Sequence, residues 1–187
     1  MKWALIFGFF LSVSALQAQV EEQPEPPRGF YVGMMTGGVY FMDSGDRRLF
    51  KDAMSLGFRL GYDVFKYLSF ETQFRFSGNS SSLSGSGDEG IPKTFVNYQA
   101  LGVMRGLWPI TRRFSVFLDA GAGLWHSNPN MKEVVGQATR VSFMGGAGLQ
   151  YFLRIRGLAM GADVSLASVR DLKGLVLQPN VYLRYTF

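Results

Sequence analysis

The residues of this chain best placed to do chemistry are charged side chains that stand at alternating positions within otherwise apolar segments. They are five arginines and four carboxylates: Arg59, Asp63, Glu71, Arg75, Arg105, Asp119, Arg140, Asp163 and Arg184. Near-balance of charge suits a confined interior, because an unpaired buried ion is costly. Such a set can form a closed network of salt bridges or line a narrow ion path. Short connections favour three cross-strand pairs: Arg59 with Glu71, Arg105 with Asp119, and Asp163 with Arg184.

A second candidate is His126, the only histidine, which stands beside Ser127 in the stretch LWHSNPN. Acyl transfer needs the nucleophile and its base within hydrogen-bond reach. Neighbouring side chains of a strand point to opposite faces, so Ser127 is predicted to point away from His126. A third member, Glu133, falls in a predicted loop. One histidine and no cysteine offer little for a metal, and we expect no catalytic site, cofactor or metal.

The sequence also gives no support for a phosphate-binding loop or for nucleic-acid binding. The glycine-rich strings GSGDEG and MGGAGLQ are not followed by the Lys-Ser/Thr of a P-loop, so they are interpreted as turns and strand glycines. The formal charge is +5, and it falls to +4 when Lys2 is removed with the N-terminal signal described below. That mild excess is not the basic patch of a nucleic-acid-binding protein.

The N-terminus has the features of an export signal. Lys2 precedes an apolar stretch, Trp3 to Val13, and Leu16-Gln17-Ala18 forms a cleavage site of small-residue type. We therefore predict a signal peptide over residues 1–18, a Pro-rich lead-in over 19–28 and one domain over 29–187. Beyond the signal, no run of 18 apolar residues could form a membrane-spanning helix.

Strands must position the charged residues, because the domain consists of segments that alternate apolar and polar residues. Eight are predicted, over 29–42, 53–64, 68–78, 95–107, 113–126, 138–152, 157–169 and 175–187. In the third, Phe70, Phe74 and Phe76 share one face, and Glu71 and Arg75 share the other. The charged residues thus occupy one face of the sheet and the apolar rows occupy the other.

Two architectures fit such strands, a soluble sandwich or barrel with apolar faces inside and a membrane barrel with apolar faces outside. The lysines gather in the connections, and alternating small residues in DAGAGL and GGAGLQ suit a narrow lumen. A sheet in lipid must also close to satisfy its edges. We therefore predict an all-β fold, an eight-stranded antiparallel transmembrane up-and-down β-barrel.

The connections fix an orientation. Loops 43–52, 79–94, 127–137 and 170–174 are predicted to face outward, and the short turns near 65–67, 108–112 and 153–156 to face the periplasm. Aromatic residues near the strand ends are expected in interfacial girdles: Phe41, Phe65, Tyr67, Trp108, Trp125, Tyr151 and Phe187. Pro179 lacks a ladder donor, and a bulge or an early strand end is expected there.

The signal, the eight segments and the terminal YLRYTF resemble the small outer-membrane β-barrels of the OmpA/OmpX type of Gram-negative bacteria. The resemblance implies that the outer-membrane assembly machinery reads the alternating terminal residues Val181, Leu183, Tyr185 and Phe187. Members with a peptidoglycan-binding domain continue beyond the barrel, whereas this sequence stops, so no such anchoring is expected. The histidine stretch also resembles the lipid A 3-O-deacylases, whose motif is His-x-Ser-Asn; here the serine directly follows the histidine.

The sequence therefore favours a non-catalytic outer-membrane protein with a structural or surface-interaction role, such as membrane integrity, adhesion or protection. Two alternatives stay open, a narrow ion or small-solute channel and a lipid A-modifying enzyme. The expected partners are outer-membrane lipid, lipopolysaccharide, the assembly machinery and an unidentified surface ligand, and no nucleic acid.

Overall fold

The structure is a computed structural model of the chain that describes residues 28–42, 51–80, 94–128, 138–172 and 174–187. The predicted signal peptide, all of the lead-in except Arg28, and most of the three longer predicted loops lie outside these residues. In the described part of the chain, no helix has the length and apolarity needed to cross a membrane.

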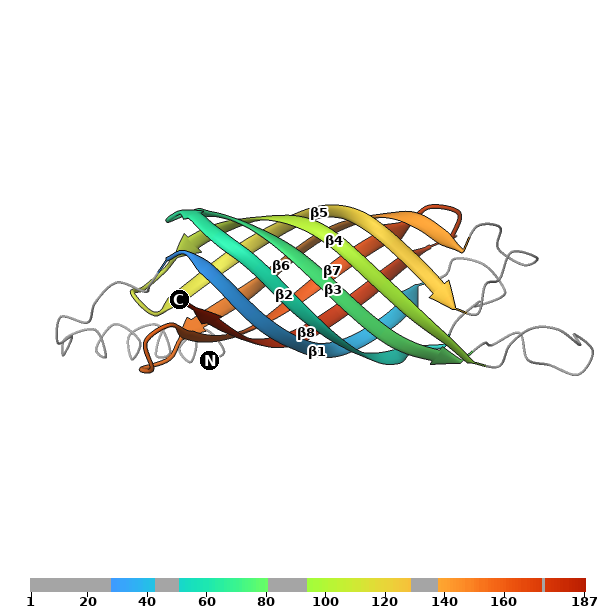
Figure 1. Cartoon of the computed structure of the whole chain (residues 1–187), viewed down its shortest axis with the longest axis horizontal. Helices are drawn as coiled ribbons and strands as arrows, with labels where there is room; N and C mark the ends of the chain where they lie inside the picture. Colours follow the sequence, from blue (N-terminus) through green and yellow to red (C-terminus); the bar gives the residue numbers. More distant parts are fainter. Residues whose placement is uncertain (1–27, 43–50, 81–93, 129–137, 173) are drawn as a thin grey trace, which may run out of the picture.

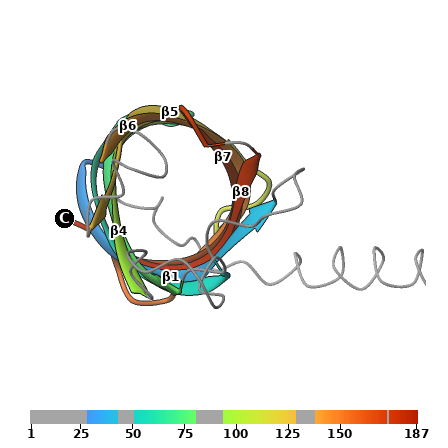
Figure 2. The ribbon, with the colours of Figure 1, turned by 90° about the vertical axis from the view of Figure 1, so that its right-hand side faces the viewer.

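Eight antiparallel strands form a closed barrel in which each strand pairs with its neighbours in the sequence and β1 closes against β8 (Figures 1 and 2). The strands are β1 (Phe30–Met42), β2 (Ala53–Phe65), β3 (Leu68–Ser80), β4 (Thr94–Pro109), β5 (Phe114–Asn128), β6 (Thr139–Phe152), β7 (Leu158–Val169) and β8 (Leu175–Thr186). This confirms the predicted fold, and no boundary differs from the predicted one by more than two residues. Closure leaves no open edge, as a sheet in lipid requires.

The two ends of the barrel differ. The start of β1 pairs with the end of β8, so both strands meet at one end, which we call the termini end (Figure 1). The tight turns after β2, β4 and β6 lie at this same end. We call the opposite end, where β1 finishes at Met42, the loop end. The even number of strands places both chain termini of the barrel on one side.

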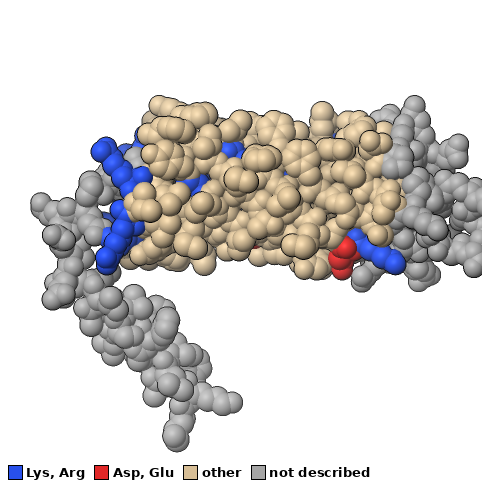
Figure 3. Space-filling view, turned by 60° about the horizontal axis from the view of Figure 1, so that its bottom comes forward, with Lys and Arg blue, Asp and Glu red and all other residues tan. Residues whose placement is uncertain are grey.

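The strands turn their apolar residues outward and their polar residues inward. On β3, Phe70 is 50% exposed whereas Ser69 is fully buried, and on β5 Leu118 is 56% exposed whereas Asp119 is 7% exposed. On the face shown in Figure 3, charged residues gather at the two ends and the surface between them is almost wholly uncharged. Apolar rows outside and polar rows inside are the pattern of a barrel that sits in lipid.

Pro179 does not end its strand, so that part of the expectation was wrong. β8 continues to Thr186, and Pro179 lies opposite Val164 of β7 in an unbroken register. On the other side, pairing with β1 stops after Gly37–Asn180 and resumes at Tyr40–Leu177. The register is the same before and after this gap, so the missing N–H interrupts the ladder locally without a bulge.

Candidate functional site

All nine predicted charged residues lie on the inward faces of strands β2 to β8, where they fill the barrel lumen. Eight of them are buried, and Asp63 at the end of β2 is partly buried. The open ring seen in Figure 2 is therefore a ring of backbone whose interior holds side chains. In a barrel of eight strands the interior is just wide enough for side chains to fill it.

The centre of the lumen is an ion cluster around Arg105, which is fully buried. Its Nε and Nη2 atoms donate to the two carboxylate oxygens of Asp119, both at 2.8 Å, as predicted for this pair. Nη2 also lies 3.2 Å from Oε1 of Glu71, which is 3.9 Å from Nη1 of Arg59, the second predicted pair. Paired, hydrogen-bonded charges of this kind are the form in which ions tolerate burial.

The predicted pair of Asp163 with Arg184 was wrong. Asp163 instead pairs with Arg59 across the lumen and accepts a hydrogen bond from Asn180 at 2.8 Å. Arg184 pairs with Asp63 of β2, near the termini end. The cause is the register of the β7–β8 hairpin, which sets Asp163 opposite Asn180 and Arg184 opposite Ala159.

The two remaining arginines lie elsewhere in the lumen. Arg75 is held by neutral partners: it donates to the amide oxygens of Gln178 and Gln73, the latter at 2.7 Å, and to Ser165 at 3.3 Å. Arg140 stands near the start of β6 at the loop end, opposite Trp125.

A repeated arrangement that sequence reasoning missed supports three of the arginines. Each guanidinium lies over an aromatic ring, and each ring comes from the residue directly opposite an inward-facing glycine on the neighbouring strand. The three stacks are Arg59–Tyr182–Gly161, Arg105–Phe117–Gly148 and Arg184–Tyr31–Gly61, with guanidinium carbon to ring centroid distances of 4.3, 4.0 and 3.7 Å. A side chain on any of these glycines would collide with the ring. The glycine thus leaves room for the ring, and the ring makes a cation–π contact with the guanidinium.

Toward the loop end the lumen becomes apolar. The cluster there comprises Val39, Phe41, Phe95, Leu101, Val103, Trp125, Met144, Ala167, Val169 and Val176, with Leu172 packed against it. Phe41 and Trp125 were expected in an interfacial girdle, and this was wrong, because both share the inward phase of their strands. Trp125 is only 1% exposed, whereas Trp108, also predicted for the girdle, is 48% exposed on the outer face.

A polar strip crosses this apolar region. Ser127 donates to Oδ1 of Asn97 at 2.7 Å, and Asn97 donates to Oδ1 of Asn79 at 2.9 Å. The indole Nε1 of Trp125 donates to the Ser127 hydroxyl at 3.3 Å. Buried polar groups of the lumen therefore bond to one another beside the apolar cluster.

His126 and Ser127 point apart, as strand alternation predicts. Ser127 faces the lumen and is 1% exposed, whereas His126 is exposed on the outer face of β5. The Nδ1 atom of the imidazole lies 2.9 Å from Oγ1 of Thr139 on β6. Glu133 lies outside the described residues. Within the described ranges, no group of three or more His, Cys, Asp or Glu could hold a metal ion.

Comparison with known proteins gives a family and a fold. The sequence model of the family described as outer membrane protein beta-barrel domain matches residues 5–184. No curated protein matches the sequence. Among solved structures, Neisserial surface protein A is similar over 85% of this chain and 97% of its own, with a TM-score of 0.61 and 16% identity.

Two further solved barrels are similar at lower identity. The outer membrane enzyme PagL matches over 84% of this chain and 99% of its own, with a TM-score of 0.52 and 13% identity. Ail, the attachment invasion locus protein of Yersinia pestis, matches over 87% of this chain and 100% of its own, with a TM-score of 0.51 and 15% identity. At these identities the likeness concerns the fold alone.

Proposed function

Since the chain belongs to the outer membrane protein beta-barrel domain family, we propose that it is a non-catalytic protein of the Gram-negative outer membrane with a structural or surface-interaction role. Its outward apolar rows hold the barrel in lipid, its paired lumen keeps the barrel closed, and its long connections present a surface for adhesion or protection. These connections lie mostly outside the described residues.

The observation that carries this proposal is the filled lumen. Four buried or partly buried arginines, at 59, 75, 105 and 184, stand with four carboxylates, at 63, 71, 119 and 163, so the middle of the barrel has no net formal charge. Above it, Trp125 and Phe95 are each 1% exposed within the apolar cluster. Charge-balanced packing in the middle of the barrel and apolar packing toward the loop end support a closed lumen.

Conductance in a planar lipid bilayer tests the closed lumen. Purified, folded protein should give no resolved single-channel openings. Trp125→Ala should show leak, because it removes a large ring from the lumen, and Trp108→Ala is the matched control because it removes the same ring from the outer face. Discrete, ion-selective openings from the wild type that survive repurification would refute the closed barrel.

A narrow channel is the second candidate, and unpartnered buried donors favour it. Nη1 of Arg105, Nη1 of Arg184 and Nε of Arg75 have no hydrogen-bond partner among the described protein atoms. Donors of this kind are commonly satisfied by internal water. A chain of water molecules that joined these donors to the polar strip of Asn79, Asn97 and Ser127 would make an ion path. The same bilayer recording distinguishes such a path from separate water sites.

A lipid A-modifying enzyme is the third candidate. The contact of His126 with Thr139 places a hydroxyl beside an imidazole on the lipid-facing side, which is what such chemistry needs first. The inward direction of Ser127 weighs against it. A deacylase assay on lipopolysaccharide decides: activity that is present in the wild type and lost in His126→Ala would favour the enzyme, and no activity in either would end it.

The proposed partners follow from the outer surface. Val181, Leu183, Tyr185 and Phe187 all point outward, with 43–67% exposure, so they are presented together to lipid or to the assembly machinery during insertion. Ail has been solved in complex with the heparin analogue sucrose octasulfate, and its fold likeness is consistent with a surface role for this chain. We include export through a cleaved signal peptide over residues 1–18 in the proposal.

A further inference from the structure

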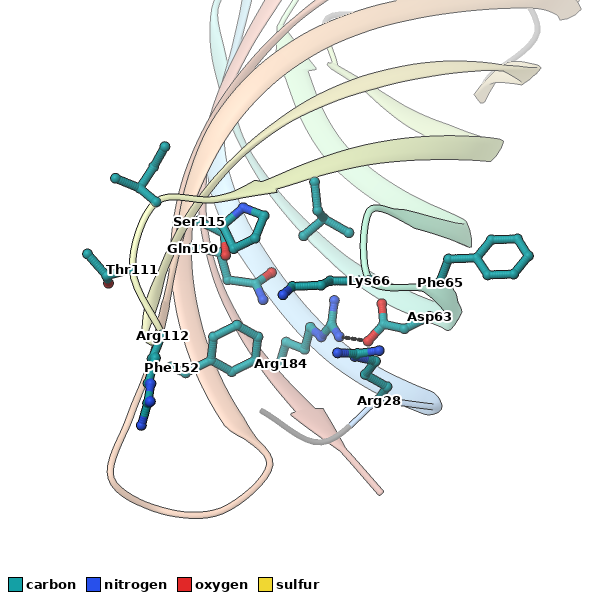
Figure 4. Close-up of a pocket in the computed structure, with 13 residues that line it drawn as sticks. Arg28, Asp63, Phe65, Lys66, Thr111, Arg112, Ser115, Gln150, Phe152 and Arg184 are labelled. Atoms are coloured by element: carbon teal, nitrogen blue, oxygen red, sulfur yellow. Dashed lines mark hydrogen bonds and ion pairs between the residues drawn. The ribbon is translucent and has the colours of Figure 1, made fainter. Parts of the chain in front are cut away.

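The termini end of the barrel opens into a pocket of about 330 Å³ that the lumen network does not fill (Figure 4). Its lining comes from the segment before β1, from strands β2, β4, β5, β6 and β8, and from the β2–β3 and β4–β5 turns. The pocket is therefore built by strands far apart in the sequence that meet only when the barrel closes.

One wall of the pocket is cationic. Lys66 and Arg184 line it together with a single carboxylate, Asp63, so these three side chains carry a net formal charge of +1. Arg184 and Asp63 pair with each other, and the side chains of Arg28 and Lys66 extend into the same space (Figure 4). Arg112 also belongs to the lining, but its guanidinium points away. The excess positive charge in a recess of low polarity favours an anion.

Two buried donors in this wall have no protein partner. Gln150 is fully buried, and its Oε1 accepts a hydrogen bond from the Tyr182 hydroxyl at 3.1 Å, while its Nε2 donates to none of the described atoms. Arg184 is 2% exposed, and its Nη1 also has no hydrogen-bond partner among the described atoms. Unsatisfied buried donors are costly, so a site that holds two beside excess positive charge is matched to an oxygen-rich anion.

Apolar residues also line the pocket. We call them its apolar wall: Leu107, Pro109, Ile110 and Phe152, with Phe65 at the border. A bare oxyanion would leave this wall in contact with water, whereas a ligand with an anionic group and an apolar body would cover both walls.

We propose that this pocket binds a phosphate-class anion attached to an apolar body. Gln150, Lys66 and Arg184 hold the anion, and the Leu107–Phe152 wall covers the apolar part. Such a group is supplied by the headgroup region of an anionic phospholipid or by a soluble phosphate ester. This binding is independent of the proposed surface role, which concerns the opposite end of the barrel.

The test follows the backbone amide resonances of Ser115 and Gln150, which line the pocket, in isotope-labelled barrel folded in non-ionic micelles at constant ionic strength. Short-chain phosphatidylglycerol, short-chain phosphatidylcholine and inorganic phosphate are titrated separately. Lys66→Gln should weaken phosphatidylglycerol binding roughly fivefold, the effect of losing one exposed charge-assisted contact. Gln150→Glu keeps the acceptor for Tyr182 but replaces the free donor with an anionic oxygen, so it should abolish binding. Arg156→Gln is the matched control, because Arg156 is an exposed turn cation of the same end outside the pocket lining.

The three titrations distinguish a lipid ligand from a soluble anion, and they define the results that overturn the proposal. Phosphatidylglycerol that saturates more tightly than inorganic phosphate, with phosphatidylcholine inactive, supports the site and identifies the lipid headgroup. Equal saturation by inorganic phosphate contradicts the proposal, because inorganic phosphate has no apolar body to cover the Leu107–Phe152 wall. The proposal is overturned if no phosphate compound saturates, if phosphatidylcholine binds as well as phosphatidylglycerol, or if Arg156→Gln loses as much as Lys66→Gln. Heat-modifiable gel migration shows beforehand that each variant is folded.

Discussion

Replacing Arg105 with methionine should destabilise the barrel by about 3–5 kcal/mol, the cost of breaking a buried ion pair from one side. The guanidinium is fully buried, bonds to both oxygens of Asp119 at 2.8 Å and lies 3.2 Å from Glu71. Removing it leaves two carboxylates buried with less positive charge than before. Methionine is chosen because its unbranched, adaptable chain keeps contact with the ring of Phe117.

A second substitution separates the lost charge from the lost packing. Arg105→Met combined with Asp119→Leu removes one cation and one anion, so the lumen regains its balance. We expect the double variant to recover about 1–3 kcal/mol relative to the single one, a coupling of the size seen for residues in direct contact. Arg156→Met, at an exposed turn, should change the free energy of unfolding by less than about 0.5 kcal/mol.

Urea unfolding in phospholipid vesicles, followed by tryptophan fluorescence, gives these free energies by linear extrapolation. Gel migration with and without heating gives the folded fraction independently. A loss below about 1 kcal/mol for Arg105→Met would refute the view that the cluster needs its cation. A double variant less stable than the single one would show that packing, and not charge balance, governs this part of the lumen.

Three further predictions use the same readouts. Leu118→Arg should cost about 2–4 kcal/mol, because Leu118 faces lipid from the first half of β5; a cost no larger than that of Leu118→Ala would argue against lipid contact. Gly148→Val should cost about 1–3 kcal/mol by overpacking, because its Cβ would meet the Phe117 ring and lie 2.8 Å from Cβ of Asp163, whereas Gly145→Ala meets no atom closer than 4.0 Å and should be nearly neutral. Phe187→Ala should lower the amount of folded barrel in the outer membrane without lowering folding in vesicles, and an equal loss from Ile155→Ala, another exposed apolar residue of the termini end, would contradict a specific assembly signal.

The fold was predictable because alternation is a local property that each strand carries by itself. Phe70 and Glu71 are adjacent in sequence, and the backbone of a strand must place them on opposite faces. The same rule correctly separated His126 from Ser127 without any knowledge of the neighbouring strands. All nine charged positions were assigned to the lumen on this basis, and each of them faces inward.

Contacts between strands were predictable only where a tight turn fixed the register. Arg105 and Asp119 flank the β4–β5 turn and are direct partners in the ladder. Asp163 and Arg184 flank the longer β7–β8 connection, and there the register differs from the expected one by four residues. Arg59 reaches Asp163 across the lumen, a contact that depends on the shear of the whole ring and that no segment encodes alone.

The glycine–aromatic stacks show that the lumen needs space for its cations as well as a balance of charge. Three guanidinium groups lie over the rings of Tyr31, Phe117 and Tyr182. There is room for each ring because the residue opposite it is glycine, where a Cβ would collide with the ring. Gly148 belongs to the GGAGLQ stretch that indicates a narrow lumen, and together with Gly61 and Gly161 it fixes where the rings, and through the rings the cations, are placed. A sequence with the same nine charges and bulkier residues at 61, 148 and 161 would keep the ion balance and lose the space in which the ions meet.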